Sequence, residues 1–377
     1  MQKSRFVKRY SPYETFTKSI RNEITRKKYS ESLANFLKFC DFERYEQLLE
    51  ISDTEKAEAI KEFLVYLDSE RKLSSSSINN HYYPIKLFYE VNNVLLNWKQ
   101  LSRNKPRLQR IVDDRLYTDT EIKRFIDHAN IREKVVILVL LSTGMRVGGL
   151  ASLALKDMTY IENYHLYKFL VYSDDLAERY TTFCTPECAA AIRVYLDYRK
   201  NGGEEITGDS PLIAQIADPF TYKRNQKQKP GFLTSDALTH VVNRLQQKAA
   251  IFKKEKLSPQ KKKGRIHKPA MCCHSFRKIF NTRCIENNVN AIVKETLLGH
   301  KTKLGLDIHY FRPTEQQLLQ EYLKVLDALT VNEENRLKTE NTMLKQEMEK
   351  TDKLMTQILE KFNAWENTTK VEQNHHR

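Results

Sequence analysis

The sequence contains no apolar run long enough to cross a membrane. Its longest uninterrupted run is Val135–Leu141, whereas a spanning helix needs about 20 apolar residues. The first residues, MQKSRFVKRYSPYE, lack the apolar core of a secretory signal. Hydrophobic residues make up 40% of the chain and charged residues 29%. We therefore expect a soluble, globular protein that stays in the cytoplasm and makes no membrane contact.

Cysteine is also scarce. The chain has six cysteines, far below the density of a secreted framework built on disulfides. Cys184 and Cys188 resemble a zinc-binding pair, but their spacing is wider than the usual one. Cys272 and Cys273, which precede His274, are adjacent and would point apart on any regular element. The sequence therefore favours a protein without a metal site.

Acidic residues are too few to balance the basic ones. The chain has 63 Lys and Arg against 48 Asp and Glu, a net charge of +15. Residues 331–377 are close to neutral, so the excess falls on the first 330 residues. Such an excess suits a polyanionic partner, and nucleic acid is favoured over a membrane surface because no basic amphipathic anchor is present. An ordinary basic protein is the alternative.

Charge is almost absent from Val135–Leu155, where only Arg146 is ionised. We expect this segment to be buried near the end of a helix. Burying an unpaired charge costs on the order of several kcal/mol. Arg146 therefore needs either a carboxylate from elsewhere in the fold or an anion that arrives from outside.

The expected fold class is mainly α with a small antiparallel β-hairpin or sheet. Residues 1–98 are predicted to form a small helical domain, because apolar residues recur at helical spacing in two segments. A Ser/Asp cap precedes the second of these segments. The apolar residues that define the two helical faces are Leu33, Phe36 and Leu37, then Ile60, Phe63, Leu64 and Leu67.

Residues 99–114 are predicted to be a basic linker, and 115–330 a second domain that opens with a capping box at Thr118 and Glu121. In this domain, residues 164–173 and 179–186 are rich in Tyr, Thr, Val and Phe and predict an antiparallel hairpin. A basic insertion follows at 252–268. The linker and this insertion supply the predicted phosphate-binding residues: Lys99, Arg103, Lys105, Arg107, Arg110, Lys261, Lys262, Lys263 and Arg265.

Residues 331–377 carry a 4-3 apolar repeat, with Asn341 at one a position. A single buried polar residue there favours a dimer in register. A coiled-coil tail that joins two copies of the chain is the preferred interpretation, and an amphipathic helix folded back on its own domain is the alternative.

Three short stretches carry candidate chemistry. TGMRVGGL contains Arg146, and HSFRKIFNT places His274 and Arg277 on one helical face. In LLGHKTKLGLDIHYFRP, Gly299 is expected to end a helix, His300 follows it, and Tyr310 lies shortly before a proline. Each stretch alone also fits an ordinary surface helix or turn.

In this order and spacing, the stretches resemble the tyrosine recombinase family, which includes phage and archaeal integrases and Xer-type resolvases. The resemblance covers about residues 115–325. A helical domain ahead of this region, joined to it by a basic linker, is also the family's arrangement, which implies that residues 1–98 form a DNA-binding domain. It implies that Tyr310 attacks a DNA phosphodiester to form a 3′-phosphotyrosine link, without a metal, ATP or another cofactor. It also implies that Arg146 and Arg277 hold the phosphate oxygens, while His274 and His300 assist proton transfer. The implied assembly is a tetramer on double-stranded DNA.

The chain departs from the family pattern at two places. Gly149 stands where an acidic residue is common, and the predicted hairpin turn, SDDLAER, has no lysine to act as general acid. Lys168 and Arg179 lie nearby, but neither occupies the turn. These departures keep open the alternative of a DNA-binding relative without catalysis. A type IB topoisomerase is a further alternative, because it shares the same chemistry. The target site, and the choice between integration, excision and dimer resolution, are not encoded in a legible form.

Overall fold

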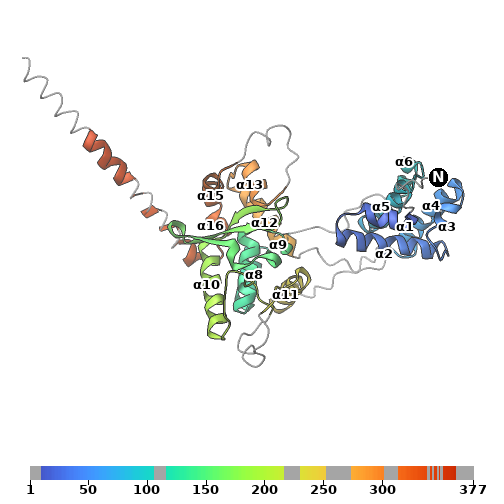
Figure 1. The fold of residues 1–377 in the computed structure, drawn as a ribbon. Coiled ribbons are helices and arrows are strands. Elements are labelled where there is room, and N and C mark those ends of the chain that lie inside the picture. Colours follow the sequence, from blue (N-terminus) through green and yellow to red (C-terminus); the bar gives the residue numbers. More distant parts are fainter. Residues whose placement is uncertain are drawn as a thin grey trace, which may run out of the picture. The chain divides into compact units, whose positions relative to one another are not determined.

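The computed structural model describes residues 10–105, 116–215, 230–251, 273–300 and 313–361, the last range with gaps at 338–339, 342–343, 346–347 and 349–350. The chain divides into two compact units, one containing described residues 10–105 and the other containing the rest (Figure 1). Over these ranges the chain is mainly helical with a three-stranded antiparallel sheet, which confirms the expected fold class. No helix within them is long and apolar enough to cross a bilayer.

The first unit is a bundle of helices around one apolar core. As predicted, the two apolar faces are buried in this core, with Phe36 and Ile60 fully enclosed. The predicted cap is also present, because the Ser52 hydroxyl accepts a bond from the Glu55 amide and the Glu55 carboxylate accepts one from the Ser52 amide. The helices are α1 (Pro12–Ser19), α2 (Glu23–Phe39), α3 (Gln47–Glu50), α4 (Asp53–Ser69), α5 (Ser75–Val91) and α6 (Trp98–Ser102).

Helix α6 corrects the predicted start of the linker. Leu101 is buried in the core of the first unit. Lys105 donates a hydrogen bond of 3.1 Å to Asn79 and lies 4.2 Å from the ring centroid of Tyr82. Residues 99–105 therefore belong to the helical unit, and we placed the boundary too early because a helix this short leaves no readable period.

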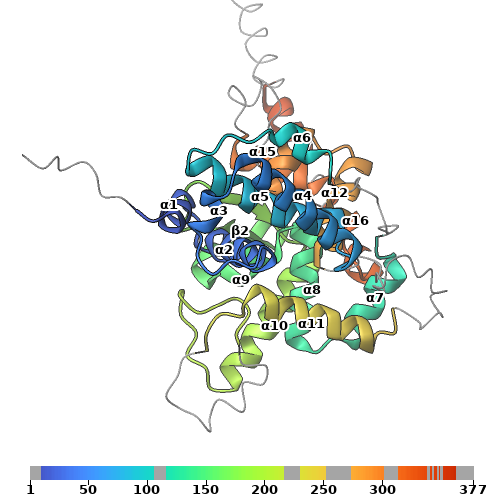
Figure 2. The ribbon, with the colours of Figure 1, turned by 90° about the vertical axis from the view of Figure 1, so that its right-hand side faces the viewer.

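The second unit is built around the apolar helix α8 (Ile131–Thr143), which other helices surround (Figure 2). The capping box at Thr118 and Glu121 opens this unit as predicted. Burial of almost every α8 side chain explains why the sequence is apolar all round instead of along one stripe. The helices packed against α8 are α7 (Asp119–His128), α9 (Val147–Ser152), α10 (Pro186–Asn201), α11 (Ser235–Lys248), α12 (Cys273–Glu286) and α16 (Leu326–Leu329).

The sheet contains β1 (Met158–Ile161), β2 (Leu166–Val171) and β3 (Tyr180–Phe183) in that order, all antiparallel. Strands β2 and β3 confirm the predicted hairpin. Strand β1 was not predicted, since none of its side chains is fully buried and it therefore lacks the alternation by which strands are recognised. Two short 3-10 helices, η1 (Leu155–Asp157) and η2 (Glu162–Tyr164), flank β1.

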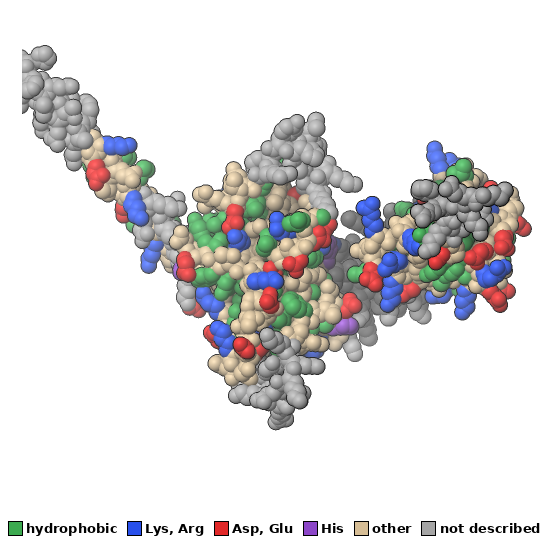
Figure 3. Space-filling model, viewed as in Figure 1, with side chains coloured by type: hydrophobic (Ala, Val, Ile, Leu, Met, Phe, Trp, Pro, Cys, Tyr) green, Lys and Arg blue, Asp and Glu red, His purple; other side chains and the backbone are tan. Residues whose placement is uncertain are grey.

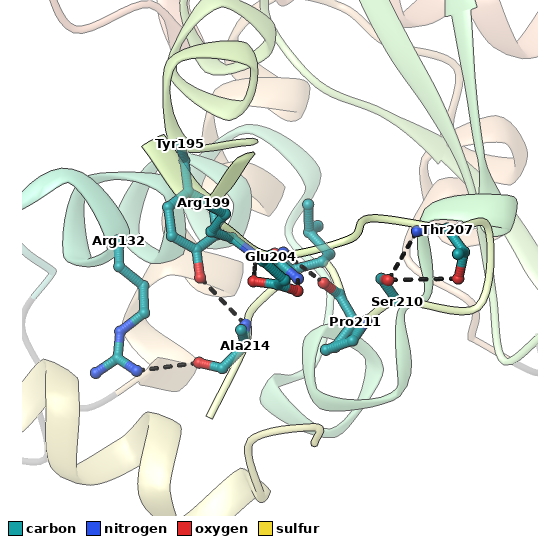
Figure 4. Close-up of polar contacts among 9 residues, drawn as sticks. Arg132, Tyr195, Arg199, Glu204, Thr207, Ser210, Pro211 and Ala214 are labelled. Atoms are coloured by element: carbon teal, nitrogen blue, oxygen red, sulfur yellow. Dashed lines mark hydrogen bonds and ion pairs between the residues drawn. The ribbon is translucent and has the colours of Figure 1, made fainter. Parts of the chain in front are cut away.

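A buried ion pair anchors the segment after α10 (Figure 4). Arg199 is 1% exposed and donates to both carboxylate oxygens of Glu204. The third guanidinium nitrogen donates to the Pro211 carbonyl at 2.7 Å. The Tyr195 hydroxyl accepts from the Ala214 amide, whose carbonyl accepts from Arg132. These contacts hold residues 204–214 against α10 and have a structural role in the second unit.

The remaining helices form a smaller apolar cluster with the sheet. They are α13 (Ala291–Leu297) and α15 (Glu315–Leu323). After α16, the Val331 amide donates to Glu187 of α10 at 2.8 Å. The described residues of the following helical tail are exposed, including Leu344, Met348 and Ile358.

Candidate active site

The chain turns sharply at the end of α8, and this turn places Arg146. Gly144 adopts φ +61°, and a Cβ atom there would lie 2.7 Å from the Phe280 ring and 2.9 Å from Leu298. Only glycine fits both the backbone and the space. Arg146 then takes the N-cap position of α9 and is exposed. The expectation that Arg146 is buried within a helix was therefore wrong, since the turn carries it out of the apolar segment.

Arg277 is the buried arginine of the site. It lies on α12 and is 4% exposed. One guanidinium nitrogen donates to the Gly144 carbonyl at 2.8 Å and another to the Leu298 carbonyl at 2.7 Å. Burial lowers the pKa of Arg277, and the nearby charge of Arg146 lowers it further. Arg277 thus joins the turn after α8 to the turn after α13.

The turn after α13 presents His300. Gly299 has φ +62°, as expected for a helix C-terminus, and the His300 amide donates to the Glu295 carbonyl at 3.0 Å. The His300 Nδ1 bonds the Glu295 carboxylate at 2.5 Å. Burial opposes ionisation of Glu295, but bonds from His300 and Lys294 outweigh it and lower its pKa. Glu295 therefore orients the imidazole and leaves Nε2 to face a ligand.

The described parts of the three stretches converge in space. The Arg146 guanidinium donates to the Gly299 carbonyl at 3.5 Å, and Arg277 contacts both turns. His274 is exposed at the start of α12. Its pKa is lowered by partial burial and then by the positive charges of Arg277, Arg146 and His300. Four basic side chains from three separate segments thus share one location.

No carboxylate forms an ion pair with Arg146 or Arg277 within the described part of the chain. Their hydrogen-bond partners among these residues are backbone carbonyls, which carry partial charge only. The negative charge of Glu295 also acts on Arg277, but the Glu295 carboxylate is bonded by His300 and Lys294. The sequence offered two explanations for Arg146, an internal carboxylate or an external anion. The geometry favours the second and extends it to Arg277, since planar guanidinium groups suit the oxygens of a phosphate.

The structure also accounts for Gly149. A Cβ atom at this position would lie 2.8 Å from Val171 and 3.8 Å from the Tyr172 ring. An acidic side chain has no room there, because the end of β2 occupies the space. Lys168 does not supply the missing hairpin lysine either. Its amine bonds both carboxylate oxygens of Glu315 at 2.9 and 3.0 Å.

Two tyrosines of the hairpin belong to the site although the sequence gave no signal for them. The Tyr180 ring covers Gly299, where a Cβ atom would lie 2.3 Å from it. Burial raises the pKa of Tyr180 to about 12, against the opposing charge of Arg277. Tyr172 lies beside it, with ring centroids 6.3 Å apart. A tyrosine in a strand is common, so only the tertiary contacts identify these two.

Several predicted residues lie outside the described ranges, so the structure does not place them. They are Arg107, Arg110, Lys261, Lys262, Lys263, Arg265, Cys272 and Tyr310. Lys99 and Arg103 are exposed on the first unit. Cys184 and Cys188 are buried in the apolar core. Within the described ranges, no group of three or more His, Cys, Asp or Glu side chains could hold a metal ion.

Comparison with known proteins identifies the family. A probable integrase/recombinase of Methanocaldococcus jannaschii is 22% identical over 278 residues, which cover 70% of this chain and 74% of that protein. The tyrosine recombinase XerC of Leptospira interrogans is 22% identical over 310 residues, covering 78% and 85%. Both matches extend well beyond the three motifs.

Two solved structures share the fold. The Tn1549 transposon integrase in complex with circular intermediate DNA has a TM-score of 0.54 at 17% identity and covers 83% of this chain and 99% of its own. The XerH site-specific recombinase bound to its difH substrate has a TM-score of 0.50 at 18% identity, covering 79% and 78%. The phage integrase family matches residues 115–317. Because this match spans more than half of the sequence, the chain belongs to the phage integrase family of tyrosine recombinases.

Proposed function

We propose that this protein is a site-specific DNA recombinase that cuts and rejoins DNA through a 3′-phosphotyrosine link at Tyr310. The observation that carries the proposal is the convergence of Arg146, His274, Arg277 and His300, with no carboxylate ion-paired to either guanidinium group among the described residues. A site with this surplus of positive charge binds an anion. A phosphodiester is the anion that the family's chemistry requires.

In the proposed reaction, the Tyr310 hydroxyl attacks the phosphorus and the bond to the 5′-oxygen breaks. His274 takes the tyrosine proton, a role that its lowered pKa favours because the ring stays neutral near pH 7. Arg146 and Arg277 stabilise the charge that develops on the non-bridging oxygens. His300, oriented by Glu295, donates to the same phosphate. The phosphotyrosine bond preserves the energy of the phosphodiester, so the cycle needs no ATP.

DNA binding is supported by two observations. The XerH and Tn1549 structures were solved with DNA, and this chain has a net charge of +15. On the face shown in Figure 3, basic and acidic side chains are interspersed over the described parts of both units. Lys99 and Arg103, together with the basic residues of 106–114 and 252–268, supply further phosphate contacts. Affinity should therefore fall steeply with salt.

The active assembly is proposed to be a tetramer on two duplexes, with the tail joining copies. Leu337, Leu344 and Met348 are each more than half exposed, although they occupy the a and d positions of the 4-3 repeat. Burying such a stripe against a second copy removes apolar surface from water. The first residue of the tail, Val331, donates its amide hydrogen bond to Glu187 of the second unit, which fixes where the repeat begins.

The test is a covalent capture experiment with the full chain. The protein is incubated in EDTA, without ATP, with fragmented DNA from its source, including the DNA that flanks its own gene. Fragments that stay attached in SDS are recovered and sequenced. The expected result is one enriched sequence whose attachment disappears in Tyr310→Phe.

Each outcome of the capture is informative. If no fragment is captured above the Tyr310→Phe background, the recombinase proposal is overturned and a catalytically silent DNA-binding protein is favoured. If fragments of unrelated sequence are captured equally and supercoiled plasmid is relaxed, the protein is a topoisomerase and not a site-specific enzyme.

A further inference from the structure

The proposed reaction leaves one proton without a source. When the bond between phosphorus and the 5′-oxygen breaks, the departing alkoxide is strongly basic and needs a general acid. The family uses a lysine of the hairpin for this step, and the turn here has none. Lys168 is engaged with Glu315. Arg179 is a poor acid, because a guanidinium does not release its proton in proteins.

Tyr172 occupies the start of this turn, directly after β2. Its φ is +54°, a left-handed conformation that is a true outlier for a bulky residue. Such strain persists only where the surrounding structure enforces it. The conformation swings the phenol off the strand and over the first turn of α9.

The glycine pair at 148 and 149 makes room for the phenol. A Cβ atom at Gly148 would lie 3.2 Å from the Tyr172 hydroxyl oxygen, and one at Gly149 would lie 3.8 Å from the ring. The hydroxyl is therefore held next to the backbone that immediately follows Arg146. Both departures from the family pattern, the missing acid and the missing lysine, meet at this one side chain.

The surroundings keep the phenol protonated and ready to donate. Burial raises the pKa of Tyr172, and the positive charges of Arg146 and Arg277 only partly oppose it. An unperturbed tyrosine has a pKa of about 10, close to about 10.4 for lysine, so the two residues suit the same step. The same arginines would stabilise the phenolate that forms after proton transfer.

We propose that Tyr172 is the general acid for the 5′-leaving group, in place of the hairpin lysine. The inference rests on the proposed recombinase function. During cleavage, Tyr310 forms the bond to phosphorus, the bond to the 5′-oxygen breaks, and that oxygen takes the Tyr172 proton. During rejoining, the incoming 5′-hydroxyl returns a proton to the Tyr172 phenolate as it attacks phosphorus and displaces Tyr310.

The test compares two versions of the captured DNA site, one unmodified and one with sulfur in place of the bridging 5′-oxygen. A thiolate leaves without protonation, so the sulfur substrate does not need the acid. Tyr172→Phe removes only the hydroxyl. It should slow covalent attachment to unmodified DNA by about 10²-fold or more, while attachment to the sulfur substrate stays within about threefold of the unaltered protein.

Matched variants decide the assignment. Tyr180→Phe alters the neighbouring tyrosine, and Lys168→Met removes the competing lysine, so neither should show a defect that sulfur rescues. Equal slowing of Tyr172→Phe on both substrates would make Tyr172 a positioning residue and overturn the proposal, as would an unchanged rate on unmodified DNA. Rescue of Lys168→Met by sulfur would assign the role to Lys168. Failure of the recombinase function is a separate result, in which the unaltered protein attaches to neither substrate.

Discussion

Arg199 and Arg277 are buried to almost the same extent in the second unit, at 1% and 4% exposure, yet they have opposite electrostatic settings. Arg199 donates to both carboxylate oxygens of Glu204, so its charge is cancelled inside the fold. Arg277 donates to the carbonyls of Gly144 and Leu298 and forms no ion pair with a carboxylate among the described residues. Burial alone therefore does not identify a functional arginine. The absence of a balancing carboxylate among the described residues distinguishes the second from the first.

The partners of Arg277 explain how the fold tolerates its charge. The Gly144 and Leu298 carbonyls lie at the C-terminal ends of α8 and α13, where the helix dipoles concentrate partial negative charge. Such groups reduce the cost of burial without cancelling a full unit charge. The remaining positive charge of Arg277 is available to bind an anionic ligand.

The largest expected effect separates the two arginines by activity. Arg277→Met should reduce the rate of covalent attachment to DNA by about 10²–10³-fold, because a preorganised cation is lost from the developing charge. The rate is measured on denaturing gels, normalised to folded protein. Arg199→Met is the matched control, and its rate per folded molecule should be unchanged. A comparable loss in both variants would remove the distinction between the two sites.

The next effect concerns stability. Glu204→Gln leaves Arg199 buried without its carboxylate and should lower the free energy of unfolding by about 3–5 kcal/mol. Urea titration measures the change. Replacing both members, with Arg199→Met and Glu204→Leu together, should recover most of it, because no unpaired charge remains. If Glu204→Gln is as stable as the unaltered chain, the fold tolerates an unpaired Arg199 and the comparison fails.

A smaller loss of stability is expected at Gly299, where the turn after α13 packs against the Tyr180 ring. Gly299→Ala places a Cβ in the left-handed region, at about 1–2 kcal/mol, and drives it into the Tyr180 ring. Unfolding in urea should show this loss or more. Gly208→Ala is the control, because a Cβ there meets only Lys156 at an ordinary 3.5 Å. Adding Tyr180→Ala to Gly299→Ala should relieve the clash but not the backbone strain, and equal stability of Gly299→Ala and Gly208→Ala would contradict the assignment.

The smallest effect is a shift in one titration. Because partial burial and neighbouring cations lower the pKa of His274, it should take up its proton below pH 6.5. The associated stability is present above pH 6.5 and is lost as the pH falls through the folded-state pKa. NMR titration of the His274 ring, assigned with His274→Gln, measures this value. Arg146→Gln should raise the pKa toward 6.5, whereas Lys156→Gln should leave it in place, and no shift in Arg146→Gln would place Arg146 too far away to act on His274.

Features that depend on apolar periodicity and on local capping and turn residues could be predicted from the sequence. The helical faces of the first unit, the capping boxes and the β2–β3 hairpin follow from such patterns, and the structure confirms them. The burial of Arg146 was predicted wrongly, because an apolar run does not reveal that a glycine in its middle reverses the chain. Tyr172, Tyr180 and Glu295 went unnoticed for a different reason. Their roles arise from contacts between segments far apart in sequence, which a single sequence does not encode legibly.

The hydrogen bonds from the two arginines to backbone carbonyls have a consequence for how such proteins diversify. Every amino acid supplies a carbonyl, so the positions that hold Arg146 and Arg277 depend on the path of the chain more than on partner side chains. Exchanges elsewhere on the surface leave that path intact as long as Gly144 and Gly299 are kept. Proteins with this arrangement can therefore change the DNA sequence that they recognise while the arginines of the active site keep their positions.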